Sequence, residues 1–424
     1  SLFLILASVT GIILSVDAVQ EKTLPYKAAD FDRLTLEEIL PVLKKSYMEI
    51  TELSVDYNQF VTLKAIDEDG NDINAYIDPK TGKTLGKPVK KSEFIQWITG
   101  LHRSLFLHET GRFFVGVISF LLFLIATSGF VLVLKRQKGI RNFFSKVVKE
   151  YFAQYYHVIL GRFALIPILV MALTGTYLSL ERFNFFMPKD EKAKELTTTS
   201  ASDLAKDRKS FFKNTLLSDV KKIEFPFTDD PEEYYIIELK DREVEVNQGT
   251  GMVTSEKLSP VRAQIAALSL DLHTGRINAV WAVILGLACI NILFFIYSGF
   301  AITLKRRSSR IKNKFKADES NYILLTGSEN GSSLRFANAI QKQLIAAGEK
   351  VFLTELNNFK TFAKAEHIIV FTSTHGLGDA PSNANKFISI LKKHMQEHKT
   401  HFSVVGFGSK AYPDFCGFGK KADA

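Results

Sequence analysis

Three histidines, His102, His157 and His273, stand at related positions beside apolar runs of the sequence. Each precedes a pair of small residues inside its run. Four such pairs occur in the chain: Thr10-Gly11, Ser128-Gly129, Thr174-Gly175 and Ser298-Gly299. Ionisable side chains at membrane depth are costly and usually functional. Histidines that face each other across helices can hold haem iron through its two axial positions.

The number of residues between each histidine and its small-residue pair places the three histidines in two groups. His102 and His273 precede their pairs by nearly the same distance, so we expect them to meet near the outer membrane face. His157 lies on a run that crosses in the opposite direction and is expected near the inner face. The same spacing counted back from Thr10 places a partner for His157 ahead of Ser1. Each histidine could also be an interfacial residue that binds no metal.

Other basic residues near these positions have open roles. Arg103, Arg162 and Arg276 are placed to meet haem propionates, or they are interfacial arginines that extend toward water. His108 is six residues from His102, so on a helix it points about 120° away and is not expected to share a haem. Gly161, one turn beyond His157, would leave room for a flat macrocycle. Four further histidines are expected at a soluble surface: His367, His394, His398 and His401.

Apolar runs position the histidines and predict a multipass helical membrane bundle with four spans. The runs are Ser1–Val16, Phe113–Leu134, Phe163–Leu180 and Ala279–Leu304. The first is short for a span of about 20 residues and could be a signal-peptide core, but the recurring small-residue pair favours a span. In membrane helices small residues allow close approach, and Ser or Thr can hydrogen-bond across to a neighbour.

The same runs predict the layout of the whole chain. We expect a span at 1–16, an outer domain at 17–100, a span at 101–134, a basic loop at 135–156, a span at 157–180, an outer domain at 181–270, a span at 271–304, a basic linker at 305–320 and a soluble domain at 321–424.

The net charge of +9 is concentrated where it sets topology. Lysines and arginines cluster at Lys135–Lys149 and Lys305–Lys316, each directly after an apolar run, which predicts that both segments are cytoplasmic. This placement argues against nucleic-acid binding. Of the two cysteines, Cys289 lies inside an apolar run and Cys416 near the C-terminus, so a bridge or a metal cluster is not expected. Redox chemistry would therefore need a bound cofactor.

The two outer segments have similar patterns. The first combines an amphipathic helix at Leu36–Tyr47 with strands broken at Asp69-Gly70, and both segments end in a strand, a Thr-Gly turn and another strand. This helix-and-hairpin unit resembles the PepSY domain, so the fold class includes two outer α+β PepSY-like domains. Asp78 is expected to shape its own turn.

Three loops in the last hundred residues follow the ends of strand-like runs. The first is Gly327–Ser333, rich in glycine and serine before a helix, a pattern typical of a phosphate cradle but also of ordinary strand-to-helix loops. The others are Thr372–Ala384 and Gly406–Cys416. Open α/β sheets bind ligands at the carboxyl ends of their strands, where all three loops emerge.

The membrane part resembles the PepSY-associated transmembrane reductases, which include bacterial ferric-siderophore reductases. The resemblance rests on the four spans, the two outer units, Leu101–Leu105 and Leu272–Gly275. It implies that His102, His157 and His273 bind b-type haem and that electrons cross the membrane to a ferric siderophore or ferric iron.

The soluble part resembles the flavodoxin-like domain of diflavin reductases such as the sulfite reductase flavoprotein, which predicts a cytoplasmic α/β flavodoxin-like domain. The resemblance implies an FMN phosphate site at Ser328, Glu329, Asn330, Gly331, Ser332 and Ser333, a flavin border at Thr374, His375, Gly376 and Gly378, and stacking by Tyr412. The family often has tyrosine where His375 stands. The closing strand and helix, with FAD and NADPH modules, are expected after Ala424.

These patterns together predict an oxidoreductase of the bacterial inner membrane. Electrons would pass from NADPH and flavin through haem to a periplasmic acceptor, with outer PepSY-like domains and a cytoplasmic flavodoxin-like domain. Two alternatives need no haem: a regulatory membrane protein whose outer domains bind a ligand or protease, and a transporter without a cofactor.

Overall fold

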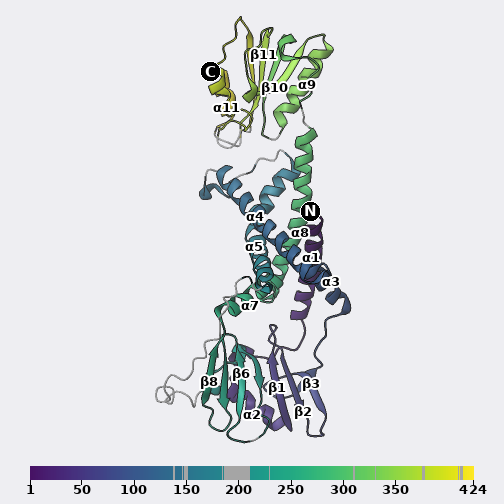
Figure 1. Cartoon of the computed structure of the whole chain (residues 1–424), viewed down its shortest axis with the longest axis vertical. Coiled ribbons are helices and arrows are strands. Elements are labelled where there is room, and N and C mark those ends of the chain that lie inside the picture. Colours follow the sequence, from purple (N-terminus) through teal and green to yellow (C-terminus); the bar gives the residue numbers. More distant parts are fainter. Residues whose placement is uncertain are drawn as a thin grey trace. The chain divides into compact units, whose positions relative to one another are not determined.

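A computed structural model gives the arrangement of the chain (Figure 1). It describes residues 1–136, 139–145, 147, 151–183, 185, 211–228, 230–308, 311–329, 331–374, 378–408, 410 and 414–424. The chain forms two compact units, which are treated separately. Unit 1 comprises Ser1–Thr127 and Ala164–Leu293, and unit 2 comprises Ser128–Phe163 and Phe294–Ala424.

Four helices in the described part of the chain are long and apolar enough to cross a membrane, as the sequence predicts. They are α1 (Leu2–Lys22), α4 (His108–Arg136), α5 (Phe152–Arg182) and α8 (Ala279–Ser308). Only a minority of their side chains are buried against other described residues. Such uniformly apolar helices suit contact with lipid.

Two shorter helices precede the second and fourth spans, and this differs from the expected boundaries at 101 and 271. His102 lies on α3 (Glu93–Ser104), which ends in a left-handed residue, Leu105, before α4 begins. His273 lies on α7 (Val261–Thr274), which ends at Gly275 with a φ of 75°. Asn278 then accepts a hydrogen bond from the Trp281 N–H at the start of α8. A C-terminal glycine followed by an N-terminal asparagine explains the break.

The outer segments form one sheet, so the expected pair of separate PepSY-like domains is not confirmed. Eight antiparallel strands are ordered β4-β3-β2-β1-β5-β6-β7-β8 (Figure 1). Strand β1 of the first segment pairs with β5 of the second, and Leu53 lies opposite Ile223. The strands are β1 (Glu49–Val55), β2 (Val61–Ile66), β3 (Asp72–Ile77), β4 (Thr84–Gly86), β5 (Val220–Glu224), β6 (Tyr234–Leu239), β7 (Arg242–Asn247) and β8 (Val253–Leu258).

One hydrophobic core serves this sheet. It joins the apolar face of α2 (Leu36–Ser46) to inward side chains of both segments, including Leu53 and Ile237. The predicted amphipathic helix is thus present, and it begins with a capping box between Thr35 and Glu38. The predicted turn at Gly70 joins β2 to β3. Other short helices are η1 (Phe31–Arg33), α6 (Phe211–Asn214) and η4 (Leu217–Asp219).

Unit 2 contains a parallel four-stranded sheet with the order β10-β9-β11-β12. This is the order 2-1-3-4 of flavodoxin-like folds. The elements are η5 (Ala317–Glu319), β9 (Tyr322–Gly327), α9 (Ser332–Ala346), β10 (Val351–Glu355), η6 (Leu356–Asn358), β11 (His367–Ser373), α10 (Phe387–Leu391), β12 (His401–Phe407) and α11 (Gly417–Asp423), and η2 (Ile140–Asn142) precedes them. Strand β9 is buried along almost its whole length, which explains its continuous apolar run.

Candidate functional site

His102 is held against the first membrane helix. Helix α3 packs on α1, and the Nδ1 atom of His102 lies 2.7 Å from the hydroxyl of Thr10. That hydroxyl also donates a hydrogen bond to the carbonyl of Leu6 at 2.7 Å. Thr10 is almost completely buried. Because its single proton is used within α1, its oxygen is available to accept a hydrogen bond from the imidazole N–H.

His273 is held in the same way against α5. Its Nδ1 atom lies 3.1 Å from the hydroxyl of Thr174 and 3.1 Å from the carbonyl oxygen of Met171. A carbonyl oxygen can only accept, so Nδ1 carries the proton. The second ring nitrogen, Nε2, then has the free lone pair. A neutral imidazole in this tautomer is a metal ligand.

The two imidazoles lie together in unit 1. Their ring centroids are 6.3 Å apart and the ring planes are inclined by 49°. Two imidazoles bound on opposite sides of one metal, through bonds of about 2.0 Å, have centroids about 6 Å apart. The separation and the tautomer fit two axial ligands of one haem iron. Within the described residues there is no cluster of three or more conventional metal ligands, so the pair itself is the candidate site.

Glycines beside the two hydroxyls permit close packing, and Gly175 gives the His273 ring room. A Cβ atom on Gly175 would lie 2.9 Å from Cε1 of His273 and 2.6 Å from the hydroxyl of Ser119. A Cβ atom on Gly11 would lie 2.8 Å from the sulfur of Cys289. The glycine of each Thr-Gly pair therefore permits close approach, while the threonine provides the acceptor.

His157 repeats this arrangement in unit 2. Its Nδ1 atom lies 2.7 Å from the hydroxyl of Ser298, and that hydroxyl donates to the carbonyl of Phe295 at 3.3 Å. The Phe295 ring packs beside the imidazole with centroids 5.0 Å apart. No described atom comes within 4 Å of a Cβ placed on Gly161. The space expected for a macrocycle beside His157 is therefore open on that side.

The neighbouring basic residues differ in their surroundings. Arg103 and His108 are exposed, and His108 is the first residue of α4. Arg162 is buried and donates to the carbonyl of Ser145 at 2.7 Å. The Arg276 guanidinium lies over the ring of Tyr57, with 4.4 Å between the guanidinium carbon and the ring centroid. A propionate role for any of them stays a prediction.

The expected flavin loops meet at the carboxyl edge of the parallel sheet. The N–H of Ser328 donates to the side chain of Asn383 at 2.8 Å, and the N–H of Ser382 donates to Glu329 at 2.9 Å. The N–H of Thr374 donates to the carbonyl of Phe407 at 3.0 Å. These bonds connect the first loop to the second and the second to the third.

Two loop hydroxyls lack a hydrogen-bond partner among the described residues. They are the side-chain oxygens of Ser328 and Thr374, and both are buried. Gly331 precedes α9 in the left-handed region, and Ser332 is the first residue of that helix. The Ser328 hydroxyl, in the loop before α9, fits the phosphate of FMN, and the Thr374 hydroxyl, directly after β11, fits its polar edge. Ser333 instead donates to the carbonyl of Gly327 at 2.8 Å and is fully buried.

The other expected flavin residues are only partly covered by the structure. Gly378 has a φ of 96° and a Cβ there would meet Asp414 at 3.1 Å, so both conformation and space require glycine. Four expected residues lie outside the described part of the chain: Asn330, His375, Gly376 and Tyr412. Of the histidines expected at the surface, His367 stacks between Tyr322 and His401 on the sheet.

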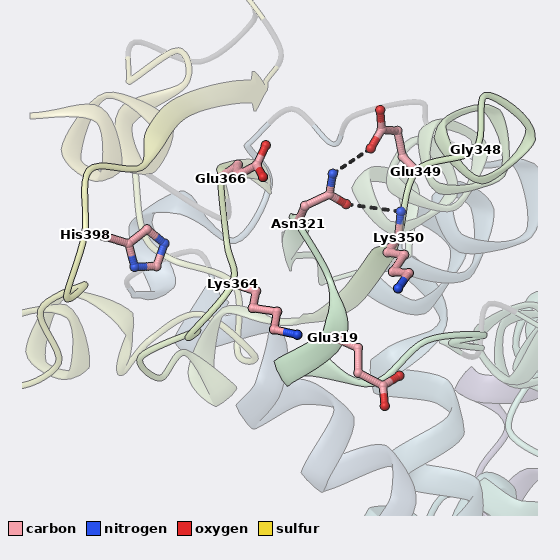
Figure 2. Close-up of a pocket in the computed structure, with 8 residues that line it drawn as sticks. All are labelled: Glu319, Asn321, Gly348, Glu349, Lys350, Lys364, Glu366 and His398. Carbon is pink, nitrogen blue, oxygen red and sulfur yellow. Dashed lines mark hydrogen bonds between the residues drawn. The ribbon is translucent and has the colours of Figure 1, made fainter.

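A cavity of about 480 Å³ lies at the opposite edge of this sheet (Figure 2). Its lining includes Asn321, Lys350 and Glu366, which precede strands β9, β10 and β11. Asn321 donates to Glu349 at 2.6 Å and accepts from the Lys350 N–H at 3.1 Å. Because flavin binds at the carboxyl edge in this fold, the cavity is separate from the flavin loops.

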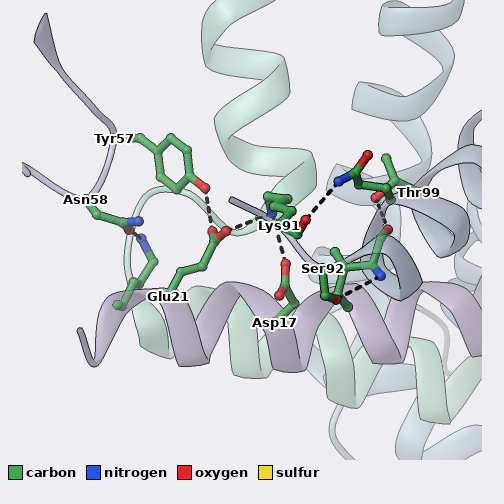
Figure 3. Close-up of polar contacts among 10 residues, drawn as sticks. Asp17, Glu21, Tyr57, Asn58, Lys91, Ser92 and Thr99 are labelled. Atoms are coloured by element: carbon green, nitrogen blue, oxygen red, sulfur yellow. Dashed lines mark hydrogen bonds and ion pairs between the residues drawn. The ribbon is translucent and has the colours of Figure 1, made fainter. Parts of the chain in front are cut away.

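A larger cavity of about 760 Å³ lies in unit 1 between α1, the β1–β2 turn and the segment entering α3. Figure 3 shows Lys91 reaching Asp17 and Glu21, both at 2.9 Å, and the Tyr57 hydroxyl donating to Glu21. Burial, and then the bond to Glu21, raise the pKa of Tyr57. Burial also raises the pKa of Asp56. The walls thus combine paired charges with apolar side chains.

The sequence pattern identifies the histidines but not their partners. Thr10, Thr174 and Ser298 belong to the small-residue pairs, which predict close helix packing and hydrogen bonds between helices without naming the bonded group. The spacing along the chain relates each histidine to the pair in its own apolar run. In the structure each histidine instead contacts a pair on another helix: His102 meets Thr10, His157 meets Ser298 and His273 meets Thr174.

Comparison with known proteins matches each part of the chain to a family. Residues 1–306 match the family PepSY-associated TM region, and residues 324–424 match the flavodoxin family. The chain is 34% identical over 105 residues to the sulfite reductase [NADPH] flavoprotein alpha-component of Aliivibrio fischeri, covering 24% of this chain and 17% of that protein. The protein of the same name from Cronobacter sakazakii is 35% identical over 118 residues, covering 27% and 20%.

The matches to these flavoproteins cover about a quarter of this chain, and the chain spans about a fifth or less of their length. A mutant flavodoxin from Pseudomonas aeruginosa is 27% identical, with a TM-score of 0.22, and the match covers 24% of this chain and 71% of that one. The first family covers well over half of the residues. The chain therefore belongs to the family of the PepSY-associated transmembrane region, joined here to a flavodoxin domain.

Proposed function

We propose that this protein is a transmembrane flavin-dependent oxidoreductase that carries electrons from the cytoplasm to an acceptor outside an inner membrane. The observation that carries the proposal is the pair His102 and His273. Both imidazoles have an acceptor beside Nδ1, and their ring centroids are 6.3 Å apart, a separation that suits two axial ligands of one iron. A flavodoxin domain on the same chain is the matching source of electrons.

The groups that would supply the redox chemistry are b-type haem and FMN. Bound haem supplies one-electron transfer, and bound FMN links one-electron and two-electron chemistry. His102 and His273 would hold one haem, and His157 would be a ligand of a second. Ser328 and Thr374 would supply hydroxyl donors to FMN. NADPH and FAD, as the reductase relatives' names and the resemblance imply, are proposed as the upstream donors.

The acceptor is proposed to be a ferric siderophore or ferric iron, and we assign it to the cavity bordered by α1 and the entry to α3. Its volume of about 760 Å³ is within the range of small-molecule sites. The same two helices carry Thr10 and His102. Asp17, Glu21 and Lys91 provide polar groups in its wall.

Absorbance spectroscopy of the purified full-length protein tests this proposal. We expect a low-spin b-type haem spectrum whose bands shift on reduction, together with FMN released on denaturation. A protein produced with ample haem that remains colourless would contradict it. That result would favour a regulatory protein or a transporter, because neither requires haem.

A further inference from the structure

A hydroxyl from a membrane helix contacts each of the three candidate metal-ligating histidines. We propose that Thr10, Thr174 and Ser298 are positioning residues: each accepts the Nδ1–H of one imidazole and so leaves Nε2 as the only nitrogen able to bind iron. This inference rests on the haem ligation proposed above. It adds which groups select the tautomer, orient the ring and set the electron-donating strength of the ligand.

All three hydroxyls have the same proton arrangement. Thr10 and Thr174 donate to carbonyls four residues earlier, both at 2.7 Å, and Ser298 donates to the carbonyl three residues earlier at 3.3 Å. A hydroxyl has one proton, so each of these oxygens can only accept from a further partner. The further partner in every case is Nδ1 of a histidine, at 2.7 to 3.1 Å.

The carbonyl of Met171 fixes the proton at His273 independently of the hydroxyl. It lies 3.1 Å from the same Nδ1 atom and cannot donate. His273 thus has two acceptors, Thr174 and Met171. In the described part of the chain His157 has one, the Ser298 hydroxyl. Losing the hydroxyl should therefore have a larger effect at His157 than at His273.

An acceptor on Nδ1–H makes the imidazole a stronger electron donor. Partners of this kind orient ligating histidines and raise their basicity, and their loss commonly costs about 10- to 100-fold in metal affinity. A more basic ligand stabilises oxidised iron more than reduced iron. Removing the acceptor should consequently raise the midpoint potential of the bound haem and speed its release.

Hydroxyls on the same helices that have no hydrogen bond to a described histidine provide matched controls. Ser8 donates to the carbonyl of Leu4 at 2.8 Å, and Thr176 donates to the carbonyl of Ala172 at 2.7 Å. Thr303 on α8 donates to the carbonyl of Gly299 at 2.8 Å. Each has the intrahelical bond of the positioning residues, so its removal reports on the helix alone.

The test uses the full-length protein with Thr174→Val, Thr174→Ser and the control Thr176→Val. We expect Thr174→Val to retain a folded protein, to bind haem up to about 10-fold more weakly, because the Met171 carbonyl still accepts the Nδ1–H, and to raise the midpoint potential of one haem slightly. Thr174→Ser should restore both quantities, and Thr176→Val should change neither. Ser298→Ala should shift the other haem further, with Thr303→Ala unchanged.

Potentiometric titration and haem transfer to an apo-globin acceptor give the two readouts without measuring reductase activity. A haem-loaded Ser298→Ala protein with wild-type potential and release rate would overturn this inference and leave the proposed function standing. So would an equal effect from Thr176→Val. A wild-type protein without haem would overturn the proposed function and this inference together.

Discussion

In the outer histidine pair, each imidazole Nδ1 already has a protein acceptor, whereas the flavin loops hold two buried hydroxyls that have none among the described residues. The pair is built from four helices, α1, α3, α5 and α7, whose packing fixes the rings. The flavin loops connect strands to helices and are tied together by a few backbone bonds. In the described residues, the hydrogen bonds of the first site are therefore complete, whereas the second leaves two hydroxyls for a ligand.

The two sites are therefore expected to hold their cofactors by different kinds of contact. In the proposed account, haem would be held by His102 and His273 through direct metal bonds. FMN would be held by many weak contacts from three loops. A single substitution should abolish the first and only weaken the second.

The largest effect is expected from His273→Ala. Loss of one of two axial ligands should remove the haem held by the pair while FMN stays bound, because the flavin loops belong to the other unit. Haem and flavin per protein, measured by pyridine haemochrome and fluorescence, check this. The exposed His108→Ala variant is the control and should keep all its haem. Loss of both cofactors from His273→Ala would show a folding defect instead of lost ligation.

A core substitution in the outer sheet should cost several kcal/mol. Leu53 is fully buried and lies opposite Ile223 of the second segment, so Leu53→Ala should lower the free energy of unfolding by about 2–5 kcal/mol. Both outer segments should unfold in one transition because they share one core. Leu325→Ala in β9 should instead destabilise the flavodoxin domain. Limited proteolysis during heating distinguishes the two, and separate cleavage transitions for the outer segments would contradict a shared core.

Ser328→Ala should produce a moderate, ligand-specific effect. A hydrogen bond to a charged phosphate contributes about 1.5–3 kcal/mol, so the Kd for FMN should rise roughly 10- to 100-fold. The stability of the FMN-free domain should hardly change, since this hydroxyl has no partner in the described residues. Fluorescence titration with FMN measures the first quantity and thermal unfolding the second. Ser389→Ala, which removes an exposed hydroxyl of α10, is the control. Equal loss of stability in both states would assign Ser328 a structural role.

The smallest effect, on the free energy of unfolding, is expected from Lys91→Ala. Burial alone would lower its pKa, but hydrogen bonds to Asp17 and Glu21 outweigh burial and raise it. The stabilisation is therefore present below the ordinary lysine pKa and is lost as pH rises above the raised value. Because these side chains are partly exposed, Lys91→Ala should cost less than about 1 kcal/mol and less still in high salt. Unfolding at two salt concentrations checks this, and a cost well above about 1 kcal/mol would show that the ion pairs are effectively buried.

Several features of the fold could be predicted from the sequence because their signals are local. The four spans follow from long apolar runs, and the helix α2 follows from its amphipathic pattern and capping residues. The parallel sheet of unit 2 follows from strand, loop and helix in repeated order. The pairing of the two outer segments in one sheet could not be predicted. Strands β1 and β5 are separated in sequence by two membrane spans, and no local signal encodes their pairing.

The candidate site was predictable to a similar degree. Matching register identifies His102 and His273 as a pair, and their rings do lie together. Their placement on separate helices α3 and α7 is harder to foresee, because Leu105 carries no helix-ending signal, although Gly275 does. The small-residue pairs predict hydrogen bonds between helices, but which group each hydroxyl meets depends on tertiary packing. The flavin loops could be located by type and order, whereas their connections through Asn383 are tertiary.

The most direct test of the central claim is stopped-flow reduction of the haem in the full-length protein by NADPH and by dithionite. It would compare wild type with a Ser328→Ala/Thr374→Val variant shown to lack FMN. If electrons reach the histidine-bound haem through the flavodoxin domain, NADPH-driven reduction should slow by about tenfold or more in the variant while dithionite reduction stays at the wild-type rate. Unchanged NADPH-driven reduction without FMN would contradict the proposed path.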